Sequence, residues 1–345
     1  MEIRLEVDYW VVDRDGELVS ADPVVDVAGR ASMSRGSADS LLTIETPFAP
    51  ADDRRRALID ELVAACETAT ALDCRLVPLA TPINGGSPYR CRRDSSDDSL
   101  PASAGARLQI HADAVLEQWN ALLALTPALA LVSSAPYVQG TRVANSARAH
   151  SYRTQHGIPT GERALEYVES IGALPSSDTP DEWPIALHRT CDSNGSSDST
   201  TLEWLLPDTS LPSQLLRLTA DVECVLEQVA RGHVRVGRYA TPRRSATAGD
   251  TDDITIGHVT NAEIALPRAE IVAQLTETAI DIGLDATGVA DYLERMGFAV
   301  DSYHPIASRI DGRQFVTQAD AQELRLEYAG RLEEDVRNLS QGGTQ

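Results

Sequence analysis

The chain opens with a strictly alternating stretch, Ile3-Arg4-Leu5-Glu6-Val7-Asp8-Tyr9-Trp10-Val11. A period of two predicts a β-strand whose odd-numbered residues form an apolar face. Glu6 and Asp8 then point to the other side, together with Trp10. Two carboxylates on a buried face are costly unless a cation neutralises them, and hard divalent cations prefer oxygen ligands. The alternative is an ordinary pair of acids on a solvated strand edge.

Three later strands carry polar side chains in a similar way. Leu41–Glu45 ends in Glu45, the strand Arg107–Ala112 carries His111, and Thr200–Leu205 carries Glu203. Each of these residues taken alone has a plain structural explanation, such as a surface acid or a core histidine. Together they predict a sheet that presents acidic groups on one face, as a sheet that binds metal ions and nucleotide phosphates would.

The order of the expected elements favours an α+β fold. Helical periodicity predicts helices over 52–72, 113–132 with a break at Pro127, 160–172, 212–231 and 317–338. These helices do not alternate regularly with the strands, which argues against a doubly wound sheet. We expect a single domain over 1–338, surface loops over 20–40, 88–106 and 241–253, and a flexible tail over 339–345.

Composition narrows the functional classes. Of 345 residues, 52 are Asp or Glu and 30 are Lys or Arg, giving a net charge of −22, so nucleic acid and membrane surfaces are poor partners. Every basic residue is an arginine, which excludes a lysine Schiff base and a phosphate-binding P-loop lysine. Such surfaces are typical of salt-loving archaea. Without a signal segment, a membrane span or a Cys-x-x-Cys pair, the sequence predicts a cytoplasmic protein with reduced thiols.

Two arginine-rich segments could bind phosphate without lysine. The first is Arg90-Cys91-Arg92-Arg93, and the second runs from Arg148 to Arg153. Guanidinium groups bind phosphate and carboxylate oxygens in a forked geometry. Surface ion pairs in an acidic protein would explain both segments equally well.

The motifs in this order resemble the bacterial and archaeal glutamate–cysteine ligase type 2 family, also called carboxylate–amine ligases. Glu6-Val7-Asp8-Tyr9 resembles its opening E-x-E and aromatic residue, and Leu42-Thr43-Ile44-Glu45 its second acidic strand. The similarity continues to about residue 236 through three segments: Leu108-Gln109-Ile110-His111, Asn145 to Arg153, and Thr201-Leu202-Glu203-Trp204 to Asp208.

The resemblance implies the fold of the glutamine synthetase superfamily, a curved and mostly antiparallel sheet with helices on its convex face. It implies ATP-dependent amide formation between an amino-acid carboxylate, commonly that of glutamate, and an amine, commonly that of cysteine. ATP and Mg²⁺ would be the cofactors, the substrates would be small molecules, and homo-oligomers are compatible with the fold. Its implied metal ligands are Glu6, Asp8, Glu45, His111 and Glu203. Its implied catalytic residues are Arg148 and Glu203, and its implied nucleotide-binding residues are Arg90, Arg92, Arg93 and Arg153.

Three departures from the family pattern leave other functions open. Asp8 replaces a glutamate, Gln109 replaces a histidine, and Leu205 stands where an arginine is expected. Leucine binds neither phosphate nor carboxylate. The chain could therefore be a relative that binds nucleotide or amino acid as a sensor or partner subunit. A phosphotransferase of the guanidino-kinase type is a more distant alternative.

Overall fold

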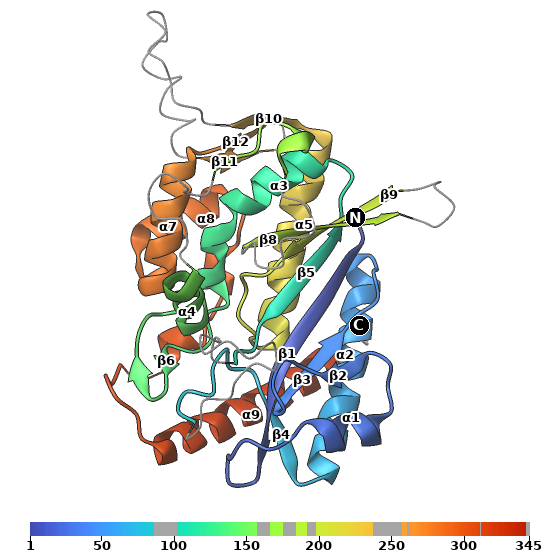
Figure 1. Ribbon diagram of the computed structural model, residues 1–345, viewed down its shortest axis with the longest axis vertical. Helices are drawn as coiled ribbons and strands as arrows, with labels where there is room; N and C mark the ends of the chain where they lie inside the picture. Colours follow the sequence, from blue (N-terminus) through green and yellow to red (C-terminus); the bar gives the residue numbers. More distant parts are fainter. Residues whose placement is uncertain are drawn as a thin grey trace, which may run out of the picture.

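The computed structural model describes residues 1–85, 102–156, 166–174, 184–191, 198–236, 257–260, 263–310 and 312–342. Its main feature is a seven-stranded sheet in the order β2-β3-β1-β5-β9-β8, with β4 paired to the far end of β1 (Figure 1). All six strand pairings in it are antiparallel. Its strands are β1 (Ile3–Asp13), β2 (Met33–Arg35), β3 (Leu41–Glu45), β4 (Cys74–Val77), β5 (Ala106–His111), β8 (Ile185–Cys191) and β9 (Asp198–Trp204).

Two smaller sheets accompany the main one. The first has the order β10-β12-β11 and the second pairs β6 with β7. Their strands are β6 (Tyr137–Val138), β7 (Thr141–Arg142), β10 (His233–Val236), β11 (His258–Val259) and β12 (Glu263–Leu266). The parallel β10–β12 pairing is joined by the antiparallel β11, so this sheet is mixed.

Helices cover one face of the main sheet, and α9 also packs against part of the other face. The helices are α1 (Asp22–Ala28), α2 (Ala51–Ala71), α3 (Val115–Ala124), α4 (Ala147–His156), α5 (Pro212–Arg231), α7 (Ala269–Asp281), α8 (Thr287–Arg295) and α9 (Gln318–Gln341). Short 3₁₀ turns lie between them, at η1 (Thr126–Leu131), η2 (Ile171–Ala173), η3 (Gly283–Asp285), η4 (Val300–Ser302) and η5 (Ala307–Arg309).

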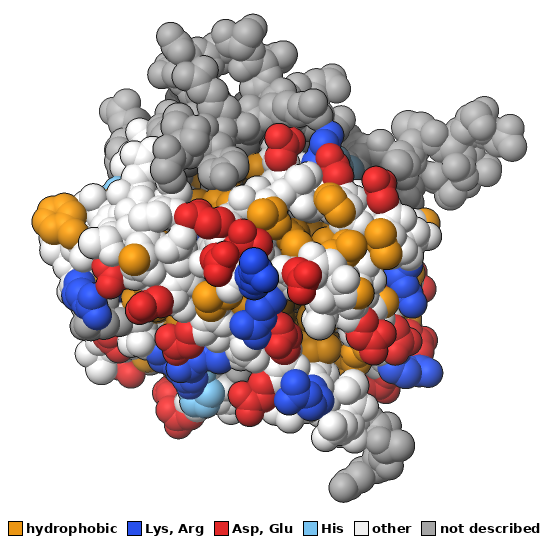
Figure 2. All heavy atoms as spheres, turned by 90° about the horizontal axis from the view of Figure 1, so that it is seen from below, with side chains coloured by type: hydrophobic (Ala, Val, Ile, Leu, Met, Phe, Trp, Pro, Cys, Tyr) orange, Lys and Arg blue, Asp and Glu red, His pale blue; other side chains and the backbone are white. Residues whose placement is uncertain are grey.

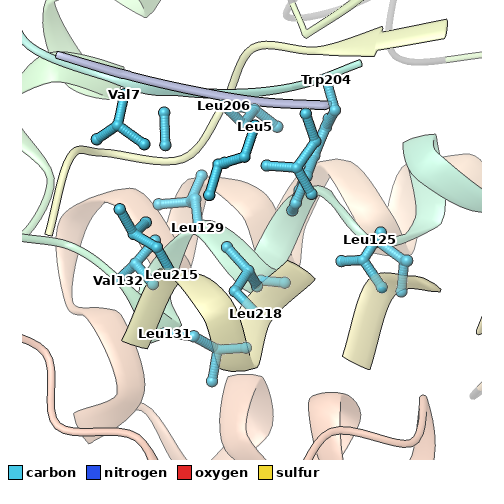
Figure 3. Close-up of a cluster of buried hydrophobic side chains, with 14 of the residues drawn as sticks. Leu5, Val7, Leu125, Leu129, Leu131, Val132, Trp204, Leu206, Leu215 and Leu218 are labelled. Carbon is cyan, nitrogen blue, oxygen red and sulfur yellow. The ribbon is translucent and has the colours of Figure 1, made fainter. Parts of the chain in front are cut away.

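The larger hydrophobic core lies between that face and the helices. Leu5 and Val7 of β1 and Trp204 of β9 project towards Leu129 of η1 and Leu218 of α5 (Figure 3). All five side chains are essentially inaccessible to solvent. Burial of this alternating apolar face is the main force that holds strands and helices together.

The opposite face divides along the length of β1. At its far end, Trp10 and Val12 pack in a second core with Tyr328 of α9 and Tyr137 of β6. At its near end, the same face carries Arg4, Glu6 and Asp8, which belong to neither hydrophobic cluster. This face of the sheet is therefore polar at the near end of β1 and apolar at its far end.

The predicted α+β class and mostly antiparallel sheet are confirmed. The helix expected over 113–132 ends at Ala124, and a 3₁₀ turn with Pro127 in its first turn continues the segment. The final helix begins at a capping box in which Thr317 and Asp320 exchange hydrogen bonds. The loop expected over 241–253 lies outside the described residues, as do residues 88–101 of the loop expected over 88–106. The end of that second prediction was wrong, because residues 102–106 are mostly buried and lead into β5, which begins at Ala106.

Two other local predictions were wrong. Residues 20–40 were expected to be a loop, but they contain α1 and the short strand β2, because buried Val24 and Met33 attach the segment to the core. The helix expected over 160–172 is absent from 166–172, where Val168 instead exchanges backbone hydrogen bonds with the side chain of Asn120.

Charge is dispersed on the face that Figure 2 shows, where carboxylate and arginine side chains are intermingled. Local ion pairs, such as Arg313 with Asp320, form despite the net charge of −22. In the described part of the chain, no helix has the length and apolar character needed to cross a membrane.

Candidate functional site

The polar face of the main sheet collects the predicted acidic residues on adjacent strands. Strand pairing places Glu6 opposite Glu45 on one side and opposite Arg107 on the other. Gln109 lies opposite Glu203. Opposed residues of antiparallel strands point to the same face. We define the polar face as Arg4, Glu6, Asp8, Thr43, Glu45, Arg107, Gln109, His111, His188, Thr201 and Glu203.

Arg107 joins the two acids of the opening strand. Its Nη1 forms an ion pair and hydrogen bond with Glu6, and its Nη2 lies 3.8 Å from Oδ2 of Asp8. Asp8 also accepts hydrogen bonds from the Thr43 hydroxyl at 2.6 Å and from the Gly105 backbone N–H at 3.4 Å. Burial nevertheless raises the pKa of Asp8, outweighing these hydrogen bonds.

Glu45 is paired with a second arginine at the edge of the face. Arg4 donates to Glu45 and also lies over the Phe48 ring, 4.4 Å from its centroid. The His111 ring stacks on Phe48 with centroids 3.9 Å apart, and its Nδ1 lies 3.3 Å from Glu2. His111 is thus directed towards the edge residues Glu2 and Phe48, whereas Glu6 and Asp8 are joined by Arg107.

Glu203 has two hydrogen-bonding partners. Gln109 Nε2 donates to one carboxylate oxygen at 3.2 Å, and His188 Nε2 lies 2.8 Å from the other. The Glu203 side chain is 13% exposed and that of His188 50%, so the pair opens to solvent through the histidine. This carboxylate can accept further hydrogen bonds from a bound amine or cation.

Arg148 lies beside the polar face, against Gly105, and bonds the main chain. Its guanidinium donates to the carbonyl oxygens of Leu205 at 3.0 Å, Leu206 at 3.1 Å and Pro207 at 3.3 Å. It packs so closely on Gly105 that a Cβ there would lie 2.7 Å from Nη2. The backbone of Leu205, rather than its side chain, therefore interacts with this positive charge.

Arg148 still affects the polar face electrostatically. The pKa of Arg107 is lowered, first by burial and then by the nearby charge of Arg148. The same positive charge partly opposes the rise in the pKa of Asp8 that burial causes. Arg148 is 5% exposed, so its position is fixed by packing and by the three carbonyl groups.

A buried carboxylate supports this arrangement. Asp208 accepts hydrogen bonds from the Ser134 backbone N–H at 3.0 Å and from the Ser146 hydroxyl, which precedes α4. Burial raises its pKa to about 6, although Arg148, Ser134 and Ser146 act in the opposite direction. Asp208 thereby connects the start of α4 to the segment that follows β9.

The predicted nucleotide-binding arginines are placed differently. Arg153 bonds Asp281 at the end of α7, with Nη2 2.7 Å from Oδ1, and it also contacts His150. It is not joined to the polar face by any interaction in the described residues. The remaining three, Arg90, Arg92 and Arg93, lie outside the described residues.

The polar face supplies the oxygen ligands that Mg²⁺ prefers, but they do not form a ready metal centre. Among the described residues, no three His, Cys, Asp or Glu side chains are close enough together to hold a metal ion. Glu6 and Glu45 already bond arginines, and His111 is turned towards Glu2. The donor types fit magnesium, whereas their present arrangement does not.

Sequence reasoning did not identify Arg107, Arg4 and His188 as members of the site. Alternation places Arg4 on the same side of its strand as Glu6. It places His188 on the same side of its strand as Ala186. Arg107 could not be assigned from its neighbours alone, because its importance depends on the register between β1 and β5.

Comparison with known proteins identifies similar solved structures but no sequence family. No family model and no curated protein matches the chain. A bifunctional glutathione synthetase from Pasteurella multocida matches with TM-score 0.49 and 14% identity, covering 96% of this chain and 53% of the other. This chain thus spans about half the length of that protein.

Two other matches extend over nearly the whole chain. A glutamate–cysteine ligase from Francisella tularensis in complex with AMP has TM-score 0.41 and 10% identity, covering 98% of this chain and 95% of the other. A glutamine synthase homologue has TM-score 0.43 and 12% identity, covering 95% of this chain and 70% of the other.

Proposed function

We propose that this protein is an ATP-dependent carboxylate–amine ligase, defined by its reaction type rather than by one amine substrate. The observation that carries the proposal is the polar face, where acids, arginines, an amide and two imidazoles from five adjacent strands share one side of an otherwise apolar sheet. The order of the motifs along the chain supports the same assignment.

The proposed reaction has two steps. A substrate carboxylate oxygen, such as that of a glutamate side chain, attacks the γ-phosphorus of ATP and ADP leaves. The amine nitrogen then attacks the carbonyl carbon of the acyl phosphate, which releases phosphate and a proton as the amide forms. Stabilising the negative charge of the phosphoryl group and orienting the amine are the two tasks that the protein must perform.

The residues of the polar face suit these two tasks. Arg4 and Arg107 carry permanent positive charge next to the face and can bind phosphoryl or carboxylate oxygens. Glu203, held between Gln109 and His188, can accept hydrogen bonds from the ammonium group of the amine substrate. Mg²⁺ enters this proposal as the ion that accompanies ATP as substrate.

Activity is tested by incubating the full chain at high salt with ATP, Mg²⁺, glutamate and a panel of amines that includes cysteine. We expect ADP release that requires both glutamate and an amine, together with an amide product. ADP formed without amide would instead identify a phosphotransferase. The absence of both products under all conditions would contradict the ligase proposal.

Two conservative variants test the assignment of the polar face. Glu6→Gln and Glu203→Gln should each lower turnover by about 100-fold or more, the typical loss when a polar group of a preorganised site is removed. Glu333→Gln is the matched control, because Glu333 also pairs with an arginine, Arg75, but does so on α9. Thermal unfolding verifies that each variant is folded.

A second function is favoured by one specific observation. The arginines that bond Glu6 and Glu45 neutralise these acids within the chain. A relative that has lost catalysis could keep this arrangement and bind nucleotide or amino acid as a sensor. Saturable ATP binding measured by calorimetry, without turnover for any amine, would favour this function over the ligase.

A further inference from the structure

On the polar face, the guanidinium group of Arg107 interacts with two carboxylates, those of Glu6 and Asp8. Glu6 and Asp8 lie two residues apart on β1, and their side chains are only 16% and 5% exposed. Water therefore screens their mutual repulsion incompletely, and a cation between them is needed. Arg107 supplies that charge through its two terminal nitrogens, with Nη1 bonded to Glu6 and Nη2 3.8 Å from Asp8.

We propose that the Arg107 guanidinium is the resident cation of the polar face, and that a divalent metal ion would have to compete with it for Glu6 and Asp8. The same side chain stays positively charged at neutral pH, because a guanidinium group remains protonated there. The chain on its own therefore binds divalent ions weakly at this place. This inference concerns ion binding alone and does not depend on the proposed ligase activity.

The register of the sheet sets the position of Arg107. Its backbone lies directly opposite Glu6 in the pairing of β1 with β5, so the two side chains leave the sheet together. On the same face lies Arg148, which packs on Gly105 and whose guanidinium is held by the carbonyl groups of residues 205, 206 and 207. Asp8 is therefore influenced by two positive charges, Arg107 at 3.8 Å and Arg148.

The neighbouring pair reinforces the same arrangement. Glu45 lies opposite Glu6 across β1 and β3, where two like charges would destabilise the pairing. Arg4 bonds Glu45, and the charge of Arg148 also acts on Asp8, so the three carboxylates of β1 and β3 meet three guanidinium groups. No net negative charge remains among these six groups, so an inserted divalent ion would have to displace an arginine.

Ion binding can be measured directly by titrating the full chain with Mn²⁺, without nucleotide, and following the free ion by electron paramagnetic resonance. Arg107→Met should gain one Mn²⁺ per chain, bound at least about tenfold more tightly than any ion of the unmodified protein at this place, a change equal to about 1.4 kcal/mol. Asp8→Asn added to Arg107→Met should abolish the gain.

The matched control is Arg75→Met. Arg75 is as exposed as Arg107, 30% against 33%, and it also pairs with a glutamate, Glu333. Because it neutralises only that one acid, its loss should produce no new site. This control also measures the non-specific attraction of Mn²⁺ to a chain of net charge −22.

Two results would overturn the proposal. One is stoichiometric Mn²⁺ binding by the unmodified chain that is as tight as in Arg107→Met and is lost in Asp8→Asn. The other is a folded Arg107→Met protein, verified by circular dichroism, that gains no ion. If methionine prevents folding, Arg107→Gln keeps donors for Glu6 and should show the same gain.

Discussion

Replacing Asp208 by asparagine should remove a pH dependence of stability that this buried carboxylate causes. Asp208 is 1% exposed, and burial raises its pKa from 3.8 to about 6. The folded protein therefore binds this proton more tightly than the unfolded chain does. Its contribution to stability is fully present below pH 3.8 and is lost as the pH rises through about 6.

The size of the effect follows from the two pKa values. At 1.36 kcal/mol per pKa unit, the change from 3.8 to about 6 corresponds to about 3 kcal/mol between acidic and neutral pH. About half of this loss of stability occurs above pH 5. It can therefore be measured away from the isoelectric region near pH 4.6. Asparagine has nearly the same shape and no charge, so its contribution does not vary with pH in this range.

Urea unfolding of both proteins between pH 5 and 7.5, at constant ionic strength, measures the difference. The other carboxylates titrate alike in the two proteins and largely cancel in the comparison. We expect the free energy of unfolding of Asp208→Asn to rise relative to the unmodified protein by about 1.4 kcal/mol over this interval. A difference that stays constant with pH would refute the reasoning.

Three further substitutions, one of them with a matched control, test the packing. Arg54→Met should lower the free energy of unfolding in urea by about 3–5 kcal/mol, because it leaves the buried carboxylate of Glu223 without its partner. Its control, Arg56→Met on the exposed side of α2, should lower that free energy by less than about 1 kcal/mol. Leu218→Ala should lower the unfolding free energy by about 2–5 kcal/mol, because it opens a cavity under β1, and calorimetry would detect the lower Tm. Thr317→Ala should cost about 1 kcal/mol through loss of the α9 cap, and an unchanged Tm would contradict that role.

Local patterns predicted much of the fold. Alternation identified β1, β3, β5 and β9, and helical spacing identified α2, α5 and α9 within a few residues. The segment 20–40 failed because short elements such as α1 and β2 gain their stability from tertiary contacts of a few side chains, here Val24 and Met33. A stretch this short has no periodic pattern from which those contacts could be predicted.

The candidate site was predicted less completely. Alternation predicts on which side of its own strand each of Glu6, Glu45 and Glu203 lies, and the strand registers of the structure bring these acids to the same face. Alternation did not predict which neighbours the individual side chains contact. His111 stacks on Phe48, and Arg148 bonds carbonyl groups, because both depend on neighbours distant in sequence.

The sequence by itself determined which side chains share a face and that the acids of β1 need a nearby cation. Both conclusions are local, since they follow from the two-residue repeat of a strand and from the cost of burying like charges. Only the tertiary structure decided which cation this is. Glu6 meets Arg107 because β1 and β5, about a hundred residues apart in the chain, pair in one register that buries both apolar faces together.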